Sequence, residues 1–197
     1  MNNFNLIFSS SSLVLDFGTA NTRSGLSTSP TPQFIFYTLI ANQKYKTILP
    51  LSREKTIISP PAALRSLFNI REPIKRGVFI DPQEDFQKLF SHVVQGLNQK
   101  KSQLQKVLIC SSSLTPRSQK AQVAKILFEK EGVQKLFFGS QPVFACFGMG
   151  RTSGLVVESG HGVTQTAAVI DGKSIKAAEN CFHFGGVDVD EYLWYLL

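Results

Sequence analysis

Two glycine-containing turns, far apart in the chain, have the residue types of a phosphate-binding site, and each follows an apolar run. The candidate binding residues in these turns are Asp16, Gly18, Thr19 and Arg23 in the first turn and Glu158, Gly160 and Gly162 in the second. Glycine lets the main chain approach an anion closely, and successive N–H groups in a tight turn form an anion-binding nest. The two turns therefore predict a pair of phosphate-binding hairpins.

The residue pattern around the first turn predicts a small β-sheet. The apolar run 13–15 and the extended stretch 23–27 predict a hairpin whose tip is 18–22, and the aromatic and β-branched stretch 33–40 predicts a third strand. Several prolines and scattered charges lie in 41–71, which predicts a small, loosely packed insertion outside the main sheet.

Helices and strands then alternate. Asp81 is placed to cap a helix that has Pro82 at its first position, with apolar residues following at spacings of three and four. The apolar run 107–110 predicts a strand, and a second helix is expected from Thr115-Pro116 to Glu131, where Gly132 follows as a stop. Residues 136–138 predict another strand.

The last third of the chain repeats the opening pattern. A short helix is expected from Gln141 through Phe147, and strands are expected at 154–157, at 163–170 and near 174–182. An amphipathic helix is expected over 188–197. This order predicts a duplicated α/β architecture, divided into a disordered lead (1–12), a first lobe (13–150) with an insertion at about 32–71, and the incomplete start of a second lobe (151–197).

Composition limits the classes of function. A chain of 197 residues with 43% apolar side chains can bury a core, and its net charge of +7 is spread along the sequence, so no nucleic-acid-binding arm is indicated. Cys110, Cys146 and Cys181 lack metal-ligand spacing and predict reduced structural thiols. No apolar run approaches the roughly 20 residues that span a bilayer, so direct membrane insertion is not expected.

Several segments in order resemble actin and the actin-related proteins: 14–25, 77–81, 114–117, 141–150 and 150–164. The resemblance covers nearly the whole chain with almost unchanged spacing. It implies an actin-like ATPase fold of the ribonuclease H-like group, in which a nucleotide lies in a cleft between two similar halves. It also implies that the backbone amides of the two hairpins hold the β and γ phosphates.

The resemblance assigns roles to single residues in the first half. Asp16 stands where the family orders the water shell of a divalent cation, and Thr19 stands where a hydroxyl meets phosphate. Arg23 replaces the usual lysine, which keeps the charge but changes its geometry. Gln141 matches the position that orients the attacking water. The cofactor that the family pattern implies is ATP with magnesium.

The second turn departs from the family pattern. Glu158 and His161 stand where the family has aspartates, and Gln165 stands where it has histidine. Phosphoryl transfer depends on positioned charge, so these exchanges predict a chain with no catalytic residues, no metal ligands and no required cofactor. The retained glycines of the two turns then indicate descent from the family and not a retained activity.

The family continues beyond the equivalent of Leu197, so the resemblance implies that much of the adenosine pocket is missing and that apolar surface on the last strands and on 192–197 is exposed. Such a surface typically marks an interface. The sequence therefore predicts a truncated actin-related protein that acts as a structural, non-catalytic subunit among other protein chains. We expect it in the cytoplasm or cytoskeleton, although the residues are equally compatible with an organellar complex.

Two alternatives remain open. The first is a degenerate ATP-binding switch or slow ATPase that a partner chain completes. The second is a nuclease-like fold in which Asp16 and Glu158 bind metal ions, but two-metal chemistry needs further converging carboxylates, and no third acidic residue has a matching position in a strand.

Overall fold

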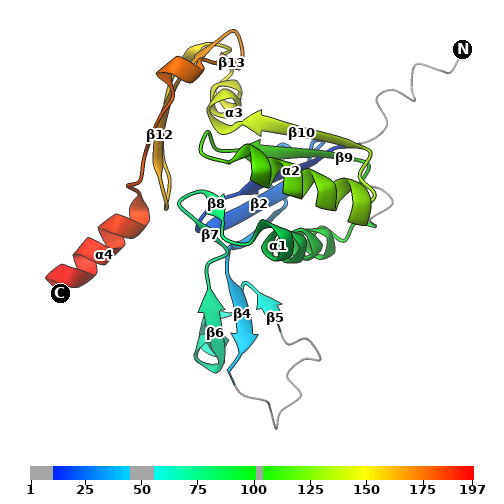
Figure 1. The fold of residues 1–197 in the computed structure, drawn as a ribbon, viewed down its shortest axis with the longest axis vertical. Coiled ribbons are helices and arrows are strands. Elements are labelled where there is room, and N and C mark those ends of the chain that lie inside the picture. Colours follow the sequence, from blue (N-terminus) through cyan, green and yellow to red (C-terminus); the bar gives the residue numbers. More distant parts are fainter. Residues whose placement is uncertain (1–10, 45–55, 101–103) are drawn as a thin grey trace, which may run out of the picture.

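The computed structural model describes residues 11–44, 56–100 and 104–197, and most of the predicted disordered lead lies outside these ranges. Figure 1 shows a central sheet with helices in front of it, a small sheet projecting from one end, and a second long sheet to one side that continues into a helix. The chain is a mixed α/β protein, as its sequence predicts.

The central sheet has five strands in the order β10-β9-β1-β2-β3. Their bounds are Leu13–Phe17 (β1), Asn21–Leu26 (β2), Phe34–Tyr37 (β3), Lys106–Ser111 (β9) and Lys135–Ser140 (β10). The predicted hairpin is confirmed, since β1 and β2 pair antiparallel with Phe17 opposite Thr22. Strands β1, β9 and β10 are mutually parallel, so their carboxyl ends meet at one edge of the sheet.

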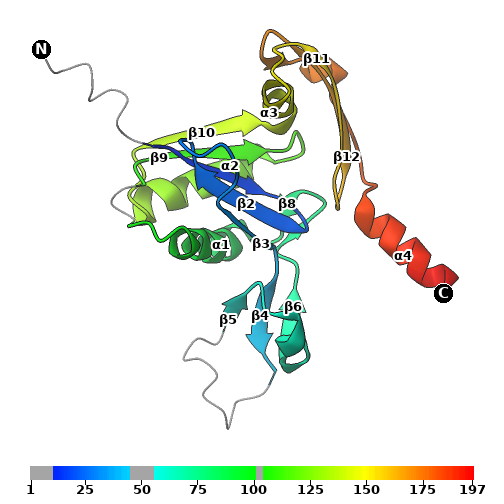
Figure 2. The ribbon, with the colours of Figure 1, turned by 180° about the vertical axis from the view of Figure 1, so that it is seen from behind.

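Two helices cover one face of this sheet. Helix α1 (Pro82–Gly96) begins as predicted, because the Asp81 side chain accepts hydrogen bonds from the amides of Gln83 and Glu84. Helix α2 (Arg117–Lys125) continues as a π-helical segment, Ile126–Lys130. No helix of the described residues covers the opposite face, which Figure 2 shows. The main core lies between sheet and helices, with Leu13, Leu15, Phe86, Leu89 and Leu127 fully buried.

The insertion forms a sheet of its own. Strands β4 (Ile40–Gln43), β5 (Thr56–Ile58) and β6 (Phe68–Arg71) pair in the order β5-β4-β6, and a 3₁₀ helix, Ala62–Leu67, precedes β6. The prediction that Ile40 ends the third strand is wrong: β3 stops at Tyr37, and Ile40 begins β4 in the small sheet. Its fully buried side chain anchors this sheet.

A short hairpin connects the insertion to α1. Strand β7 (Ile74–Lys75) pairs with β8 (Val78–Phe79), which leaves Arg76 and Gly77 as the two turn residues. This hairpin returns to the body of the molecule beside the first glycine turn, because the Gly77 amide donates a 3.3 Å hydrogen bond to Thr19 Oγ1.

The second sheet packs against helix α3 (Gln141–Gly148). Its strands are β11 (Gly154–Ser159), β12 (Thr164–Ile170), β13 (Lys173–Ser174) and β14 (Asn180–Phe182), with both β11 and β14 paired to β12. A continuous strand near 174–182 is a wrong prediction, since the 3₁₀ turn Lys176–Ala178 separates β13 from β14.

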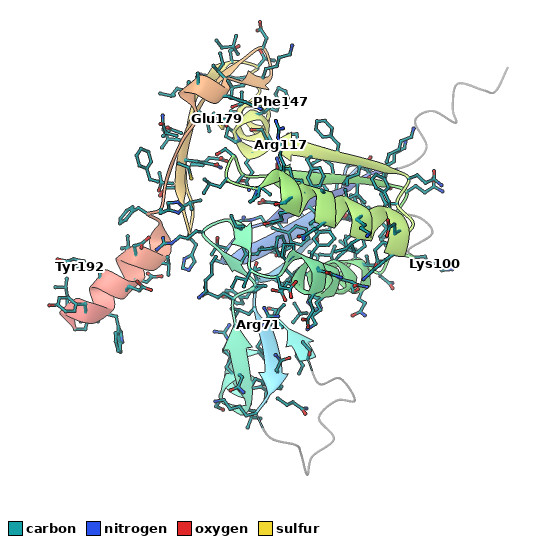
Figure 3. The ribbon with its side chains drawn as sticks, viewed as in Figure 1. Arg71, Lys100, Arg117, Phe147, Glu179 and Tyr192 are labelled. Atoms are coloured by element: carbon teal, nitrogen blue, oxygen red, sulfur yellow. The ribbon has the colours of Figure 1, made fainter. Side chains whose placement is uncertain are left out.

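Helix α4 (Gly186–Leu196) extends from the end of the second sheet. The predicted helix begins two residues earlier than expected, at Gly186. It is also not amphipathic in its packing, because none of its side chains is buried. Figure 3 shows Tyr192 on this helix, away from the rest of the molecule.

Candidate functional site

A cavity of about 560 Å³ lies where the two glycine turns meet. The structure places all of the predicted cofactor-binding residues around it: Asp16, Gly18, Thr19, Arg23, Gln141, Glu158, Gly160 and Gly162. Asp16 and Gln141 reach the cavity from the carboxyl ends of the parallel strands β1 and β10. The second turn, between β11 and β12, faces them.

The two turns are in contact. A β-carbon on Gly162 would lie 2.6 Å from Thr19 Oγ1, so any other residue at this position would push the turns apart. Within the second turn the Gly160 amide donates to the Val163 carbonyl at 2.8 Å, and within the first the Gly18 amide donates to the Asn21 carbonyl at 3.1 Å. Each turn is closed by its own hydrogen bond, and the pair forms a single wall of the cavity.

The tips of the turns carry unpaired backbone amides. Within the described part of the chain, the structure shows no hydrogen bond from the amides of Thr19, Ala20, His161, Gly162 and Val163. Consecutive unpaired N–H groups in a tight turn attract anions. The wall between the turns therefore has the donors that a phosphate group needs.

A chain of polar side chains crosses the floor of the cavity. Gln141 Nε2 donates to Asp16 Oδ1 at 3.0 Å, and Gln165 Nε2 donates to Gln141 Oε1 at 3.1 Å and to Glu158 Oε2 at 2.6 Å. Arg23 Nη1 lies 3.5 Å from Asp16 Oδ2. Both ends of the Gln141 amide are thus bonded within the protein, as is each of the two carboxylates.

Burial changes the ionisation of two groups beside this network. It raises the pKa of Glu158, an effect that Asp16 reinforces and the hydrogen bond from Gln165 opposes. Burial, followed by the charges of Asp16 and Glu158, raises the pKa of Cys110 to about 12. The thiolate form that a cysteine nucleophile needs is therefore strongly disfavoured at Cys110 at neutral pH.

The donor set fits a phosphate group better than a divalent cation. Mg²⁺ requires oxygen ligands in near-octahedral geometry. Asp16 is shared between Arg23 and Gln141, and Glu158 is bonded to Gln165. Among the described residues no three His, Cys, Asp or Glu side chains are grouped to hold a metal ion. The backbone amides at the turn tips are instead open to an anion.

Two groups at the site were missed by sequence reasoning. Ser112 Oγ donates to Gln165 Oε1 at 3.2 Å, and the Gly77 amide holds the Thr19 hydroxyl. A signal for Ser112 exists, because a serine run follows the apolar strand 107–110, and the carboxyl end of a parallel strand is where polar site residues gather. Gly77 has the positive φ of 74° that a tight turn requires.

The family model described as "Actin" matches residues 8–197 of this chain. The chain belongs to the actin family. This result confirms the resemblance seen in the motifs, and it agrees with the mixed α/β fold described above. The five segments that carry the resemblance all lie within the matched range.

Individual relatives show how much of the family fold is present. The chain is 30% identical over 191 residues to a protein named centractin from Schizosaccharomyces pombe, and this match covers 95% of the chain and 50% of the relative. It is 31% identical to an actin-like protein from Neurospora crassa and 31% identical to centractin from Saccharomyces cerevisiae, covering 94% of the chain and 49% of the relative in both cases. The chain spans about half the length of the curated relatives that it matches.

The described residues also bear on the membrane and disulfide predictions. They contain no helix that is both long enough and apolar enough to cross a bilayer. All three cysteines are free thiols, as predicted, and Cys146 is buried under the second sheet.

Proposed function

We propose that this actin-family chain acts as a structural, non-catalytic subunit of a larger protein assembly. The observation that carries the proposal is an uncovered apolar surface on the second sheet and helix α4. Large exposed apolar surfaces on soluble proteins mark interfaces with other chains. The partners we propose are further protein subunits, in the cytoplasm or cytoskeleton.

One face of the second sheet is left uncovered by the part of the chain that the structure describes. Val156 packs toward Val143 and Cys146 of helix α3, whereas its neighbours Leu155 and Val157 are 77% and 64% exposed. Alternate residues of a strand point to opposite faces, so Leu155 and Val157 lie on the face away from α3. Phe182, which is 54% exposed, adds to the same apolar region of the sheet. We call this surface the open face.

Helix α4 continues the apolar surface. Its exposed residues include Tyr192, Leu193, Trp194, Tyr195 and Leu196, and Trp194 is 83% exposed. Tyrosine and tryptophan are enriched at protein interfaces because they bury a large area with few rotatable bonds. A helix with no buried side chain of its own has this area available for a partner.

The site geometry supports a non-catalytic role. The Gln141 amide is held by Asp16 at its nitrogen and by Gln165 at its oxygen, so it could orient an attacking water only through its remaining amide hydrogen or lone pair. Asp16 is also paired with Arg23, so one of its carboxylate oxygens already faces a positive charge of the chain itself. The polar side chains at the floor of the cavity therefore form hydrogen bonds and an ion pair with one another.

The proposal predicts a large complex that depends on the open face. In native lysate the tagged chain should elute well above monomer size, and the double variant Leu155→Lys with Val157→Lys should shift it to the monomer position, because two buried charges oppose apolar docking. Size-exclusion chromatography with cross-linking measures this shift. Ile80→Lys is the matched control, since Ile80 is 57% exposed but lies outside the open face.

The wild-type chain eluting as a monomer would contradict the structural-subunit role. So would equal behaviour of the double variant and the Ile80→Lys control.

A second candidate function is an ATP-binding switch or slow ATPase that a partner chain completes. The unpaired amides of the two turns favour it, because they surround a cavity large enough for phosphate groups. In this proposal the phosphates replace the direct contact between the Thr19 hydroxyl and Gly162. Adenosine contacts would come from the partner.

Equilibrium binding of labelled ATP with magnesium separates the two candidates. The switch predicts micromolar affinity for ATP with magnesium that falls about tenfold or more in Asp16→Ala, because the carboxylate that would order the water shell of the bound cation is lost. Asp190→Ala is the control carboxylate, since Asp190 is exposed on α4 and lies away from the cavity. No saturable binding below millimolar ATP, in the presence of the assembled partners, would eliminate the switch.

A further inference from the structure

The two-residue turn between β7 and β8 has an unusual first residue. Arg76 has φ of 49° and Gly77 has φ of 74°, so both lie in the left-handed region. Glycine adopts this conformation freely, and asparagine or aspartate is the usual alternative at the first position of such a turn. An arginine there is strained, and strain of this kind persists where the side chain has a specific task.

The Arg76 side chain reaches across the molecule. Its Nη1 donates to the Gly162 carbonyl at 2.9 Å and to Asp188 Oδ2 at 2.5 Å, and its Nη2 donates to Asp188 Oδ1 at 2.6 Å. The planar guanidinium thus binds the carboxylate with two parallel hydrogen bonds and the second glycine turn with a third. Arg76 belongs to the first part of the chain, and both partners belong to the second sheet and α4.

The neighbouring residue bonds the other turn. The Gly77 amide donates to Thr19 Oγ1 at 3.3 Å, and Thr19 is the residue that faces Gly162. A single two-residue turn therefore holds the first glycine turn through Gly77 and the second through Arg76. These contacts connect segments that are 58 and 86 residues apart in sequence.

Helix α4 is attached at the same point. The Gly186 and Val187 amides donate to the carbonyls of Gly160 and His161 at 2.9 and 2.8 Å. The Gly185 amide donates to Asp188 Oδ2 at 2.8 Å. Arg76, followed by this backbone amide, holds the pKa of Asp188 well below its usual range. The first turn of α4 is thus fixed to the second glycine turn, and Arg76 joins both to the first lobe.

We propose that the Arg76–Gly77 turn is a brace that fixes the separation of the two glycine turns, with Arg76 as the positioning residue that holds the second turn and helix α4. The brace acts through Gly162 and Asp188 and touches no ligand itself. Because α4 carries much of the exposed aromatic surface, the brace also sets the direction in which that surface is presented.

Arg76→Gly tests the brace against a purely local role in the turn. Glycine suits the left-handed backbone better than arginine, so a residue that only fills the turn would give a variant of equal or greater global stability and unchanged dynamics. The brace predicts the same global stability, measured as the urea midpoint, together with amide exchange that is about tenfold faster at Gly160 and at 186–190, whose amides are hydrogen-bonded, because the three hydrogen bonds of Arg76 are lost.

A second readout is optical. Trp194 is the only tryptophan in the chain and lies on α4, so its fluorescence anisotropy reports the motion of that helix. Arg76→Gly and Asp188→Asn should both lower the anisotropy, and the double variant should lower it no further, because the two residues form one interaction. Lys75→Ala is the matched control, since Lys75 is an exposed neighbouring cation on β7.

Two results would overturn the brace. One is exchange at Gly160 and at 186–190 that stays within about twofold of the unmodified chain in Arg76→Gly. The other is exchange that rises equally in α1 and β9, because this would assign Arg76 to global stability. Arg76→Lys adds a graded check: it keeps the charge but loses the two-pronged geometry, so its exchange rates should fall between those of Arg76→Gly and the unmodified chain.

Discussion

Replacing Phe86 by alanine is expected to lower the free energy of unfolding by about 4 kcal/mol, because the substitution removes a fully buried ring and leaves a cavity. The Phe86 ring packs edge-on against Phe17 and Phe79, with ring centroids 5.5 and 6.0 Å apart, and it stacks on Phe90 at 5.8 Å. Urea denaturation followed by circular dichroism measures the loss.

The same substitution should also loosen the first glycine turn of the candidate site. Phe17 lies between Asp16 and Gly18, and its ring depends on Phe86 and Phe79 for support. Phe137→Ala is the matched control, because its ring is 60% exposed on the edge strand β10, and its removal should cost less than about 1 kcal/mol. Equal losses in the two variants would show that the Phe86 cluster is not the centre of the core.

Much of the first glycine turn and its helix could be predicted from local sequence. The cap at Asp81 and the proline that follows determine where α1 begins, and these signals act within four residues of one another. The hairpin β1–β2 is equally local. That Asp16 and Gln141 meet at one cavity follows from the parallel order of β1, β9 and β10, which the alternation of strands and helices indicates.

The contacts that hold the site together could not be predicted in this way. Arg76 meets Asp188 across 112 residues of sequence, and neither residue type nor spacing marks the pair. In a single sequence Lys75 and Arg76 are simply neighbouring cations. Tertiary packing also determines which sheet contains Ile40. Its β-branched side chain suits a strand of either sheet, and it is buried in the small one.

The two glycine turns differ in how they are supported. The first rests on the aromatic core through Phe17, whereas the second rests on polar contacts from Arg76 and α4. Apolar packing is insensitive to salt and pH over ordinary ranges, but partly exposed ion pairs are not. We therefore expect the second turn to be the more easily displaced of the two.

Arg71→Ala is expected to lower the free energy of unfolding by about 3 kcal/mol, because it leaves the carboxylate of Asp85 buried without its partner. Asp85 is fully buried on α1, and Arg71, at the end of β6, binds it with both guanidinium nitrogens, one of them at 2.7 Å. Figure 3 shows Arg71 at the junction of the small sheet and the body. Urea denaturation of the variant measures the change.

The i, i+4 pair of Lys88 and Glu84 on the same helix provides the control, because Glu84 is 58% exposed. Lys88→Ala should cost only about 0.3–0.5 kcal/mol, as solvent screens an exposed pair. Changing Arg71 and Asp85 together to methionine and leucine should recover most of the loss, since no charge is then left buried. If Arg71→Ala costs no more than Lys88→Ala, Asp85 is not held as a buried carboxylate, and the small sheet must be attached to α1 by its apolar contacts alone.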